Sequence, residues 1–273
     1  MSAIFSHVIR SCCSTCIKSA TRFDYYYFKS FSHLFLLKMN NYNRWFSSFS
    51  GDSATTQRVP GKSQKFDYLL VLDFEGTCDS PEQIDPNEII EFPVLCLKSP
   101  EMNLISTFHQ YVRPKINPQL RPFCIRLTGI IQDQVDVANE FPQVLSDFDR
   151  WIKSGFGGKD PSLSKSGDDY NFAFVTCGNW DLQKMLPLQC KLSNVNIPDY
   201  MTRWINLKAA FSKVNKRWPK HMTDMADHYG IVNEGRLHSG YDDCVCISNI
   251  VKRMAKDGYD FEITNVLKPP RFD

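Results

Sequence analysis

The chain has 273 residues, of which 42% are hydrophobic and 23% are charged, and its formal net charge is only +2. A chain of this length can form one substantial core, and this composition is typical of a soluble globular protein. Its ten cysteines include no two CxxC motifs at zinc-finger spacing, so we expect free thiols in a reducing compartment.

Residues 1–60 differ in composition from the rest of the chain. They contain seven basic and two acidic residues and are rich in serine and aromatic residues, which is typical of an organelle transit peptide. The segment around Arg44 and Trp45 resembles a processing site. Lys29 and His33 interrupt the only apolar stretch, which excludes a secretory signal and leaves the stretch too short to span a bilayer.

The sequence therefore predicts two parts, a transit peptide and linker over residues 1–60 and one domain over residues 61–273. We expect import into a mitochondrion or a plastid and no membrane partner. The alternative is an N-terminal tail without a targeting function, which would leave the protein in the cytoplasm.

The first half of the domain is rich in strand signals. Apolar runs over residues 66–74, 88–97 and 104–112 each predict a strand, and Pro93 indicates an edge or a bulge in the second one. Because the three runs follow one another closely, an antiparallel meander is expected.

Strands and helices alternate in the second half of the domain. Residues 141–152 carry apolar side chains at helical spacing, residues 155–169 have the composition of a mobile loop, and residues 172–177 predict a strand. The remaining expected elements are a helix over 181–190, a strand over 204–207, and helices over 209–214, 221–229 and 240–256. This order predicts an α/β sandwich with a mixed sheet.

Two carboxylates stand at the end of the first predicted strand. Asp73 and Glu75 are two residues apart, so their side chains point to the same face. Two such charges repel one another, and a divalent cation with a preference for oxygen ligands, Mg²⁺ or Mn²⁺, would relieve the repulsion. Alternatively, the strand ends in solvent and both acids are simply hydrated.

A third acid follows the strand over residues 172–177. Asn179 could cap the following helix, and Asp181 would then lie in its first turn. Asp181 could be a metal ligand, or it could only complement the helix dipole.

The last motif opens the final predicted helix. Ser239 is a plausible N-cap with Asp242 as its capping-box partner, so His238 lies just outside the helix and Asp243 inside it. Taken alone, His238 could be an ordinary loop histidine. We assign Asp243 as the ligand and Asp242 as the cap.

In this order and spacing, the three motifs resemble the DEDDh exonucleases. Other segments resemble the Eri-type exoribonucleases, namely Glu88-Ile-Ile-Glu-Phe-Pro93, Tyr111-Val-Arg-Pro114, Leu127-Thr-Gly-Ile130 and Trp204-Ile-Asn-Leu207. Within that family, the branch named after the prion protein-interacting member is resembled most closely, in the segments Thr176-Cys-Gly178, Trp180-Asp-Leu182 and Met185-Leu-Pro187. The resemblance covers residues 66–260 and implies an RNase H-like fold with a mixed five-stranded sheet flanked by helices.

The resemblance also implies a mechanism. Asp73, Glu75, Asp181 and Asp243 would hold two Mg²⁺ ions about 4 Å apart, or Mn²⁺, and His238 would take the proton from the attacking water. The substrate would be the single-stranded 3′ end of an RNA, released as nucleoside 5′-monophosphates, in RNA processing or in the trimming of small-RNA and rRNA ends.

The same resemblance gives expectations for substrate contacts. Glu75, Gly76 and His238 would contact the terminal nucleotide, with the bare backbone of Gly76 allowing close approach. A basic segment with two tryptophans could contact phosphates and stack bases, or could be a solvated helix face with core tryptophans. Its residues are Arg203, Trp204, Lys208, Lys213, Lys216, Arg217, Trp218 and Lys220. Phe123, Leu127 and Trp180 could line a base pocket or belong to the core.

Two other functions remain open from the sequence. A DNA 3′→5′ exonuclease would use the same acids, because the contact that separates RNA from DNA depends on pocket geometry. A catalytically silent RNA-binding adaptor could share the fold, but the complete set of acids argues against it.

Overall fold

The computed structural model describes residues 64–158, 165–166 and 169–267. The chain divides between Arg58 and Val59, so the described residues all belong to the second unit. The predicted transit peptide over residues 1–60 lies outside the described residues. Among the helices of the described part, none is both long and apolar enough to cross a membrane.

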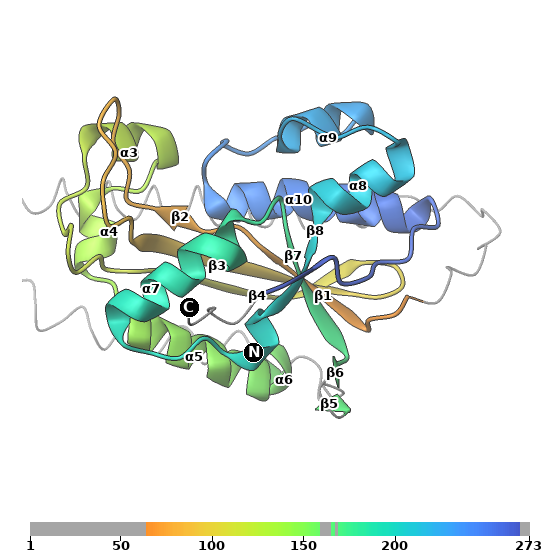
Figure 1. Ribbon diagram of the computed structural model, residues 1–273, viewed down its shortest axis with the longest axis horizontal. Helices are drawn as coiled ribbons and strands as arrows, with labels where there is room; N and C mark the ends of the chain where they lie inside the picture. Colours follow the sequence, from red (N-terminus) through yellow and green to blue (C-terminus); the bar gives the residue numbers. More distant parts are fainter. Residues whose placement is uncertain (1–63, 159–164, 167–168, 268–273) are drawn as a thin grey trace, which may run out of the picture. The chain divides into compact units, whose positions relative to one another are not determined.

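A mixed sheet forms the centre of the domain (Figure 1). The buried strand β1, Tyr68–Leu72, pairs antiparallel with β3, Ile89–Lys98, and parallel with β7, Phe172–Thr176. Strand β4, Asn103–Tyr111, pairs with the other edge of β3, and β8, Arg203–Asn206, continues the sheet beyond β7. The strand order β4–β3–β1 is the predicted antiparallel meander.

Two short strands extend the sheet beyond the five that were predicted. They are β2, Glu75–Gly76, which pairs with β3, and β9, Asn265–Val266, which pairs with β8. Two residues are too few to give a period in the sequence. The mixed α/β architecture is confirmed, and in the described residues the sheet has seven strands.

Pro93 lies in a central strand, so the prediction of an edge is wrong. The register of β3 runs from Leu72↔Val94 on β1 to Glu75↔Glu91 on β2, and the ladder is interrupted opposite Pro93. Pro93, which has no backbone N–H, is thus unpaired on the side of β1 and β2, while on its other side it pairs with His109 of β4. The register shifts of β3 and its partners lie elsewhere, between Cys96 and Leu97 and between Glu75 and Gly76.

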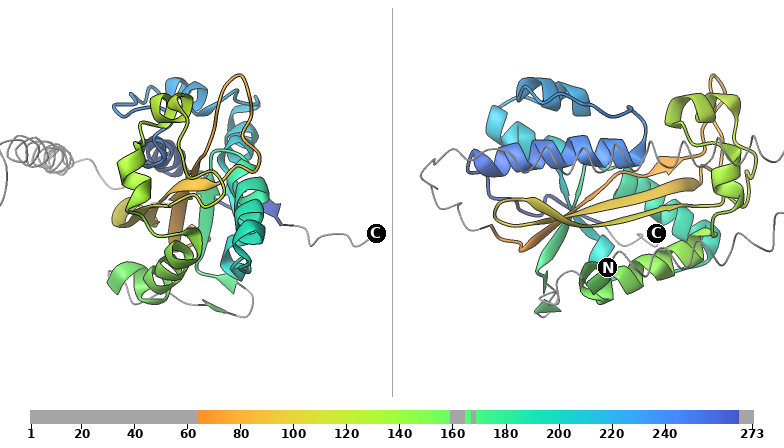
Figure 2. Two further views of the ribbon diagram at one scale, coloured as in Figure 1. Left: turned by 90° about the vertical axis from the view of Figure 1, so that its left-hand side faces the viewer. Right: turned by 180° about the vertical axis from the view of Figure 1, so that it is seen from behind.

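Side chains of β1 alternate between two cores, as expected for a strand with period two. Leu70 and Leu72 belong to one apolar cluster, and Leu69 and Val71 belong to the other. The two clusters are covered by different layers of helices, which Figure 2 shows from the side and from behind.

One layer contains the predicted helix α5, Phe141–Lys153, and the second consists of helices from the C-terminal third. With α5 lie the turn α6, Gly155–Gly158, the π-helical turn η1, Asp181–Met185, helix α7, Leu186–Ser193, and the turn η2, Asp199–Met201. The second layer contains α8, Leu207–Asn215, α9, Met222–His228, and α10, Gly240–Lys256.

Two short helices at one end of the sheet were not predicted. They are α3, Pro122–Thr128, and α4, Gln132–Asp136, and Cys124 and Val135 pack into a third apolar cluster. Helices of seven and five residues are too short to give a clear amphipathic pattern. The predicted mobile loop over 155–169 contains α6 and the strands β5, Lys165–Ser166, and β6, Asp169–Tyr170, while residues 159–164 and 167–168 lie outside the described residues.

Candidate active site

The three acidic motifs meet at one end of the sheet. Strands β1 and β7 are parallel with Val71 opposite Val175, so the segments that follow them leave the sheet at the same edge. Asp73 directly follows β1, and Asp181 begins η1 a few residues after β7. The backbone N–H of Phe74 donates to Oδ1 of Asp181 at 3.0 Å, which joins the two segments.

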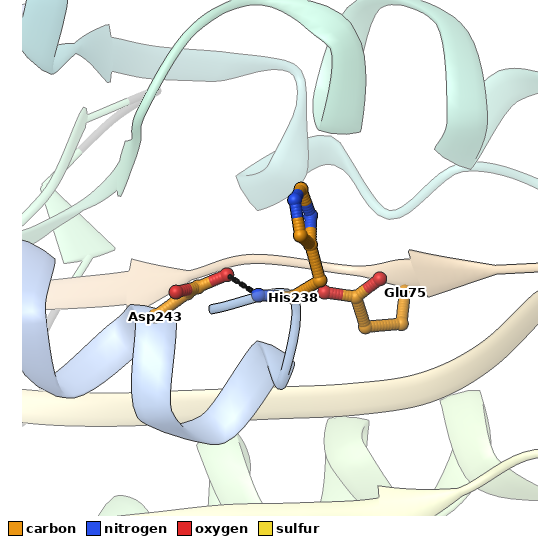
Figure 3. Close-up of side chains that lie close together, drawn as sticks. All are labelled: Glu75, His238 and Asp243. Carbon is orange, nitrogen blue, oxygen red and sulfur yellow. Dashed lines mark hydrogen bonds between the residues drawn. The ribbon is translucent and has the colours of Figure 1, made fainter. Parts of the chain in front are cut away.

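Helix α10 brings the last motif to the same place. One potential ligand atom from each of Glu75, His238 and Asp243 lies within 4.8 Å of the others. Figure 3 shows the three side chains, with Glu75 and Asp243 on either side of His238. The N–H of His238 donates to Oδ2 of Asp243 at 2.9 Å. The carboxylates are buried and the histidine is exposed, so the imidazole faces solvent at the mouth of the site.

His238 adopts an unusual backbone conformation. Its φ is 62°, in the left-handed region that side chains with a Cβ rarely occupy. Its bond to Asp243 holds the residue there, just before α10 begins. A strained conformation next to a cluster of ligand atoms is a frequent feature of functional sites.

Asp73 and Asp181 are not part of the cluster formed by Glu75, His238 and Asp243, but they influence it through their charge. Burial raises the pKa of Asp73 well above its usual range, and the charges of Asp181, Glu75 and Asp243 add to this effect. The structure therefore brings all five predicted residues to one region, with three of them in direct proximity.

The acids mutually disfavour ionisation. Burial raises the pKa of Glu75 to about 9, and the nearby charges of Glu91, Asp243 and Asp181 contribute. Burial also raises the pKa of Asp181 to about 6, against the hydrogen bond from Phe74. The pKa of Asp243 rises to about 6 for the same reason, against the hydrogen bond from His238. A positive charge bound among these groups would favour their ionised forms.

One oxygen of the site has no partner. Oδ1 of Asp243 is buried and accepts no hydrogen bond from the described residues, although its other oxygen is bonded to His238. An unpaired buried carboxylate oxygen is costly unless a cation occupies the space beside it. With Glu75 within reach, the donor set is one of hard oxygen ligands and an imidazole, which fits a divalent metal ion.

Two predicted caps are wrong. Asn179 does not cap η1, because its Oδ1 accepts from Trp204 Nε1 at 3.2 Å and from Asn206 Nδ2 at 2.9 Å. Ser239 occupies the N-cap position of α10 but makes no side-chain cap bond. Oδ2 of Asp242 accepts from the N–H of Arg236 at 3.0 Å, so Asp242 stabilises the preceding loop rather than a capping box.

The cap of α10 comes from a residue that sequence reasoning did not place in the site. Glu91 on β3 accepts the N–H of Gly240 at 3.0 Å, across a sequence separation of 149 residues. A contact between residues so far apart leaves no periodic signal. The only hint is an acidic residue within a strand that is otherwise apolar and buried.

The predicted substrate contacts are partly accounted for by packing. Gly76 has no room for a side chain, because a Cβ would collide with the Asn87 side chain and lie 3.0 Å from Met185 Cε. The role of Gly76 in nucleotide approach stays a prediction. Trp180, beside Asp181, is 47% exposed, while Phe123 and Leu127 are half-buried.

Fewer side chains of the basic segment are available to contact phosphates or stack on bases than its sequence suggests. Trp204 is 1% exposed and belongs to the core, so it cannot stack on a base, whereas Trp218 is 61% exposed. Arg217 pairs with Asp224 at 3.0 Å, and Lys213 pairs with Glu262. Two of the six basic side chains of this segment are thus paired with acids of the domain.

A known protein family, several curated relatives and several solved structures are similar to this chain. The family model described as Exonuclease (RNase_T) matches residues 70–251. The chain is 46% identical over 215 residues to ERI1 exoribonuclease 3 of Mus musculus, a match that covers 78% of this chain and 61% of that protein. The chain thus spans about three fifths of the length of this relative.

Two solved structures agree over most of the described part. The nuclease domain of 3′hExo, a DEDDh family member bound to rAMP, has a TM-score of 0.67 and 38% identity and covers 74% of this chain and 98% of its own. A 3′-exonuclease structure concerned with 3′-end recognition of histone mRNA stem-loop has a TM-score of 0.66 and 38% identity, with coverage of 74% and 87%.

The fold and the acidic site define an RNase H-like nuclease domain of the DEDDh type, a class that uses divalent metal ions. The chain belongs to the exonuclease family, and within it to the Eri-type exoribonucleases. This confirms the resemblance to the DEDDh and Eri-type exonucleases, while the branch named after the prion protein-interacting member stays a prediction.

Proposed function

We propose that this protein is a metal-dependent 3′→5′ exoribonuclease that removes nucleoside 5′-monophosphates from single-stranded RNA 3′ ends. The observation that carries the proposal is the convergence of Glu75, His238 and Asp243 within 4.8 Å, together with the unpartnered buried oxygen of Asp243. Family membership supports it, since the relatives carry the name exoribonuclease. The structural neighbour bound to rAMP holds a ribonucleotide.

Asp73, Glu75, Asp181 and Asp243 would hold the metal, which we propose to be two Mg²⁺ ions or Mn²⁺. When bound, the two ions supply neutralisation of charge on the leaving 3′ oxygen and make the attacking water more acidic. Oδ2 of Asp243 is held by the N–H of His238, so Oδ1 is the oxygen left available to a metal ion. Phe74 fixes Asp181 in the same way through Oδ1.

His238 would act as the general base. Its exposed imidazole lies beside the two carboxylates, where it can take a proton from the attacking water and release it to solvent. The hydrogen bond from its backbone N–H to Asp243 fixes the backbone of His238, and this restricts where the imidazole ring can lie beside the carboxylates. Glu75 would also contact the 3′ hydroxyl of the terminal nucleotide.

The test is a nuclease assay on 5′-labelled single-stranded RNA with Mg²⁺, Mn²⁺ or a chelator. We expect stepwise shortening from a free 3′ hydroxyl, no activity with the chelator, and a loss of about 100-fold or more in the Asp73→Ala variant. Equal degradation by wild type and Asp73→Ala would refute the proposal. A DNA strand of the same sequence serves as the second substrate. Faster shortening of DNA than of RNA would identify the protein as a DNA 3′→5′ exonuclease instead.

We also propose that residues 1–60 direct the protein to an organelle, on the strength of their seven basic and two acidic residues. A fusion of residues 1–60 to a fluorescent protein should concentrate in a mitochondrion or a plastid. A diffuse cytosolic signal would refute this targeting.

A further inference from the structure

Glu91 is a buried acid that the proposed chemistry does not use. Its side chain is 3% exposed, and in the register of β2 and β3 it stands directly opposite Glu75. Like charges in directly opposed positions of an antiparallel pair destabilise a sheet. A carboxylate at this position therefore needs partners that compensate for its cost.

Glu91 has two such partners, one on each oxygen. Oε1 lies 2.7 Å from Nε2 of His109 on β4, and Oε2 accepts the N–H of Gly240 at 3.0 Å. The ring of His109 lies beside those of Tyr111 and Tyr241, each with a centroid separation of 5.3 Å. Tyr241 is the second residue of α10. The Glu91–His109 pair therefore contacts this helix at two points, through Gly240 and through Tyr241.

The first turn of α10 is fitted closely to the sheet at this point. A Cβ added to Gly240 would lie 2.6 Å from the backbone oxygen of Asp73 and 3.1 Å from Oε2 of Glu91. Ser239, at the N-cap position, makes no side-chain cap bond. A buried carboxylate from β3 thus supplies the negative charge that favours a helix N-terminus.

The residues on either side of Gly240 are two of the three that cluster at the site. His238 lies two positions before Gly240 and Asp243 three positions after it, while Glu75 lies on β2, the strand paired with β3 beside Glu91. The Glu91 contact therefore fixes the distance between the part of the site on the sheet and the part on α10.

We infer that Glu91, oriented by His109, is a positioning residue that sets α10 against β2 so that Asp243 and Glu75 can bind one metal site. This inference rests on the proposed metal-dependent function. It assigns a task to a fifth buried carboxylate outside the DEDDh set. Groups that orient metal ligands typically change metal affinity or activity by about 10–100-fold when they are removed.

The experiment measures the Kd for Mn²⁺ by titration calorimetry on the full chain, with the melting temperature and the kcat and KM for single-stranded RNA. We expect Glu91→Ala to weaken Mn²⁺ binding about 10-fold or more and to lower kcat, with KM for RNA changed less than about threefold. Glu91→Gln can still accept from Gly240 through its amide oxygen, so it should restore part of the loss.

Glu88, which directly precedes β3, provides a matched control. It is 2% exposed, and its carboxylate accepts the backbone N–H groups of Lys115, Ile116 and Asn117, which lie in the loop after β4. Glu88→Ala should lower the melting temperature but leave the Kd for Mn²⁺ within about twofold. If Glu91→Ala lowers the melting temperature and leaves Mn²⁺ affinity unchanged, Glu91 has only a structural role and the inference fails.

His109 gives a second route if Glu91→Ala does not fold. His109→Phe retains ring contacts but loses the bond to Glu91, whereas His109→Gln can donate to it. We expect weaker Mn²⁺ binding in the first and recovery in the second, and equal affinities in both would overturn the inference. Since metal binding is measured without RNA, a wild-type protein that binds Mn²⁺ but shortens no RNA would refute the proposed function and not this one.

Discussion

Four carboxyl groups and one histidine share the end of the sheet, and burial disfavours the ionised forms of the acids. The two carboxylate oxygens of Asp243 have different surroundings. One of its oxygens orients His238, and the other is left without a partner among the described residues. The oxygen that Asp243 leaves available to a metal ion is therefore one whose burial destabilises the metal-free fold.

An Asp243→Asn substitution should separate activity from stability. The folded-state pKa of Asp243 is about 6 and its ordinary value is 3.8, so ionisation costs the metal-free fold about 3 kcal/mol above pH 6. Because the pKa is raised, this cost is absent below about pH 4 and grows as the pH rises to about 6. Asparagine does not ionise, so the variant should be nearly inactive yet melt about 6–12 °C higher than wild type at pH 8 in a chelator.

The neighbouring acid is the control for that comparison. Asp242→Asn can still accept from Arg236 and should change neither the melting temperature nor the activity by much. Melting curves of both variants at pH 8 and pH 4 would show whether ionisation of Asp243 destabilises the metal-free fold. A lower melting temperature for Asp243→Asn at pH 8 would contradict the electrostatic account.

Metal binding should stabilise the protein more strongly at alkaline than at acid pH. Binding requires ionised carboxylates, and the raised pKa values of Asp181 and Asp243, about 6, place their deprotonation between pH 5 and pH 7. At about 100 times the Kd, Mn²⁺ should add about 2.7 kcal/mol to the free energy of unfolding. We expect the gain in melting temperature to be larger at pH 8 than at pH 5.5, and a reversed order would argue against carboxylate ligands.

At the scale of elements, the sequence predicted what periodicity and composition encode. Strand β1 is uniformly apolar because helices cover both of its faces, and α5 carries apolar side chains on one face. No acid was convincing alone, and they were found through their combined order, spacing and placement at strand and helix ends, which resemble a known family. The Glu91 cap and the Asn179 contacts could not be found in this way, because each joins elements whose proximity only the fold creates.

Asn179 tests this distinction between local and tertiary contacts. Its Oδ1 receives Trp204 Nε1 and Asn206 Nδ2, and Asn206 in turn caps α8 by accepting from Lys208 N at 2.9 Å. Asn179→Ala should reduce the free energy of unfolding by about 1–3 kcal/mol, because it leaves two donors unpaired. Asn179→Ser, a good helix cap, should not restore stability, and full recovery in denaturant titrations would favour the capping role.

At the scale of the whole molecule, the described part contains all five candidate site residues and all three apolar clusters. We therefore expect residues 59–273 to fold without residues 1–58 and to retain metal-dependent nuclease activity. The comparison is between the full chain and this fragment, by melting temperature and by activity on RNA. A fragment that is folded but inactive would show that residues 1–58 contribute to catalysis.

The bond between Gly240 and Glu91 has a consequence for biosynthesis. Ribosomes make a chain from its N-terminus, so β1, β3 and β7 emerge long before α10 does, and until then the sheet lacks both His238 and Asp243. A nascent chain that has folded as far as β8 holds Asp73, Glu75 and Asp181 without the residues that complete the cluster. Under the proposed function, nuclease activity can therefore arise only after synthesis has passed α10, when the RNA that encodes the domain has already been read.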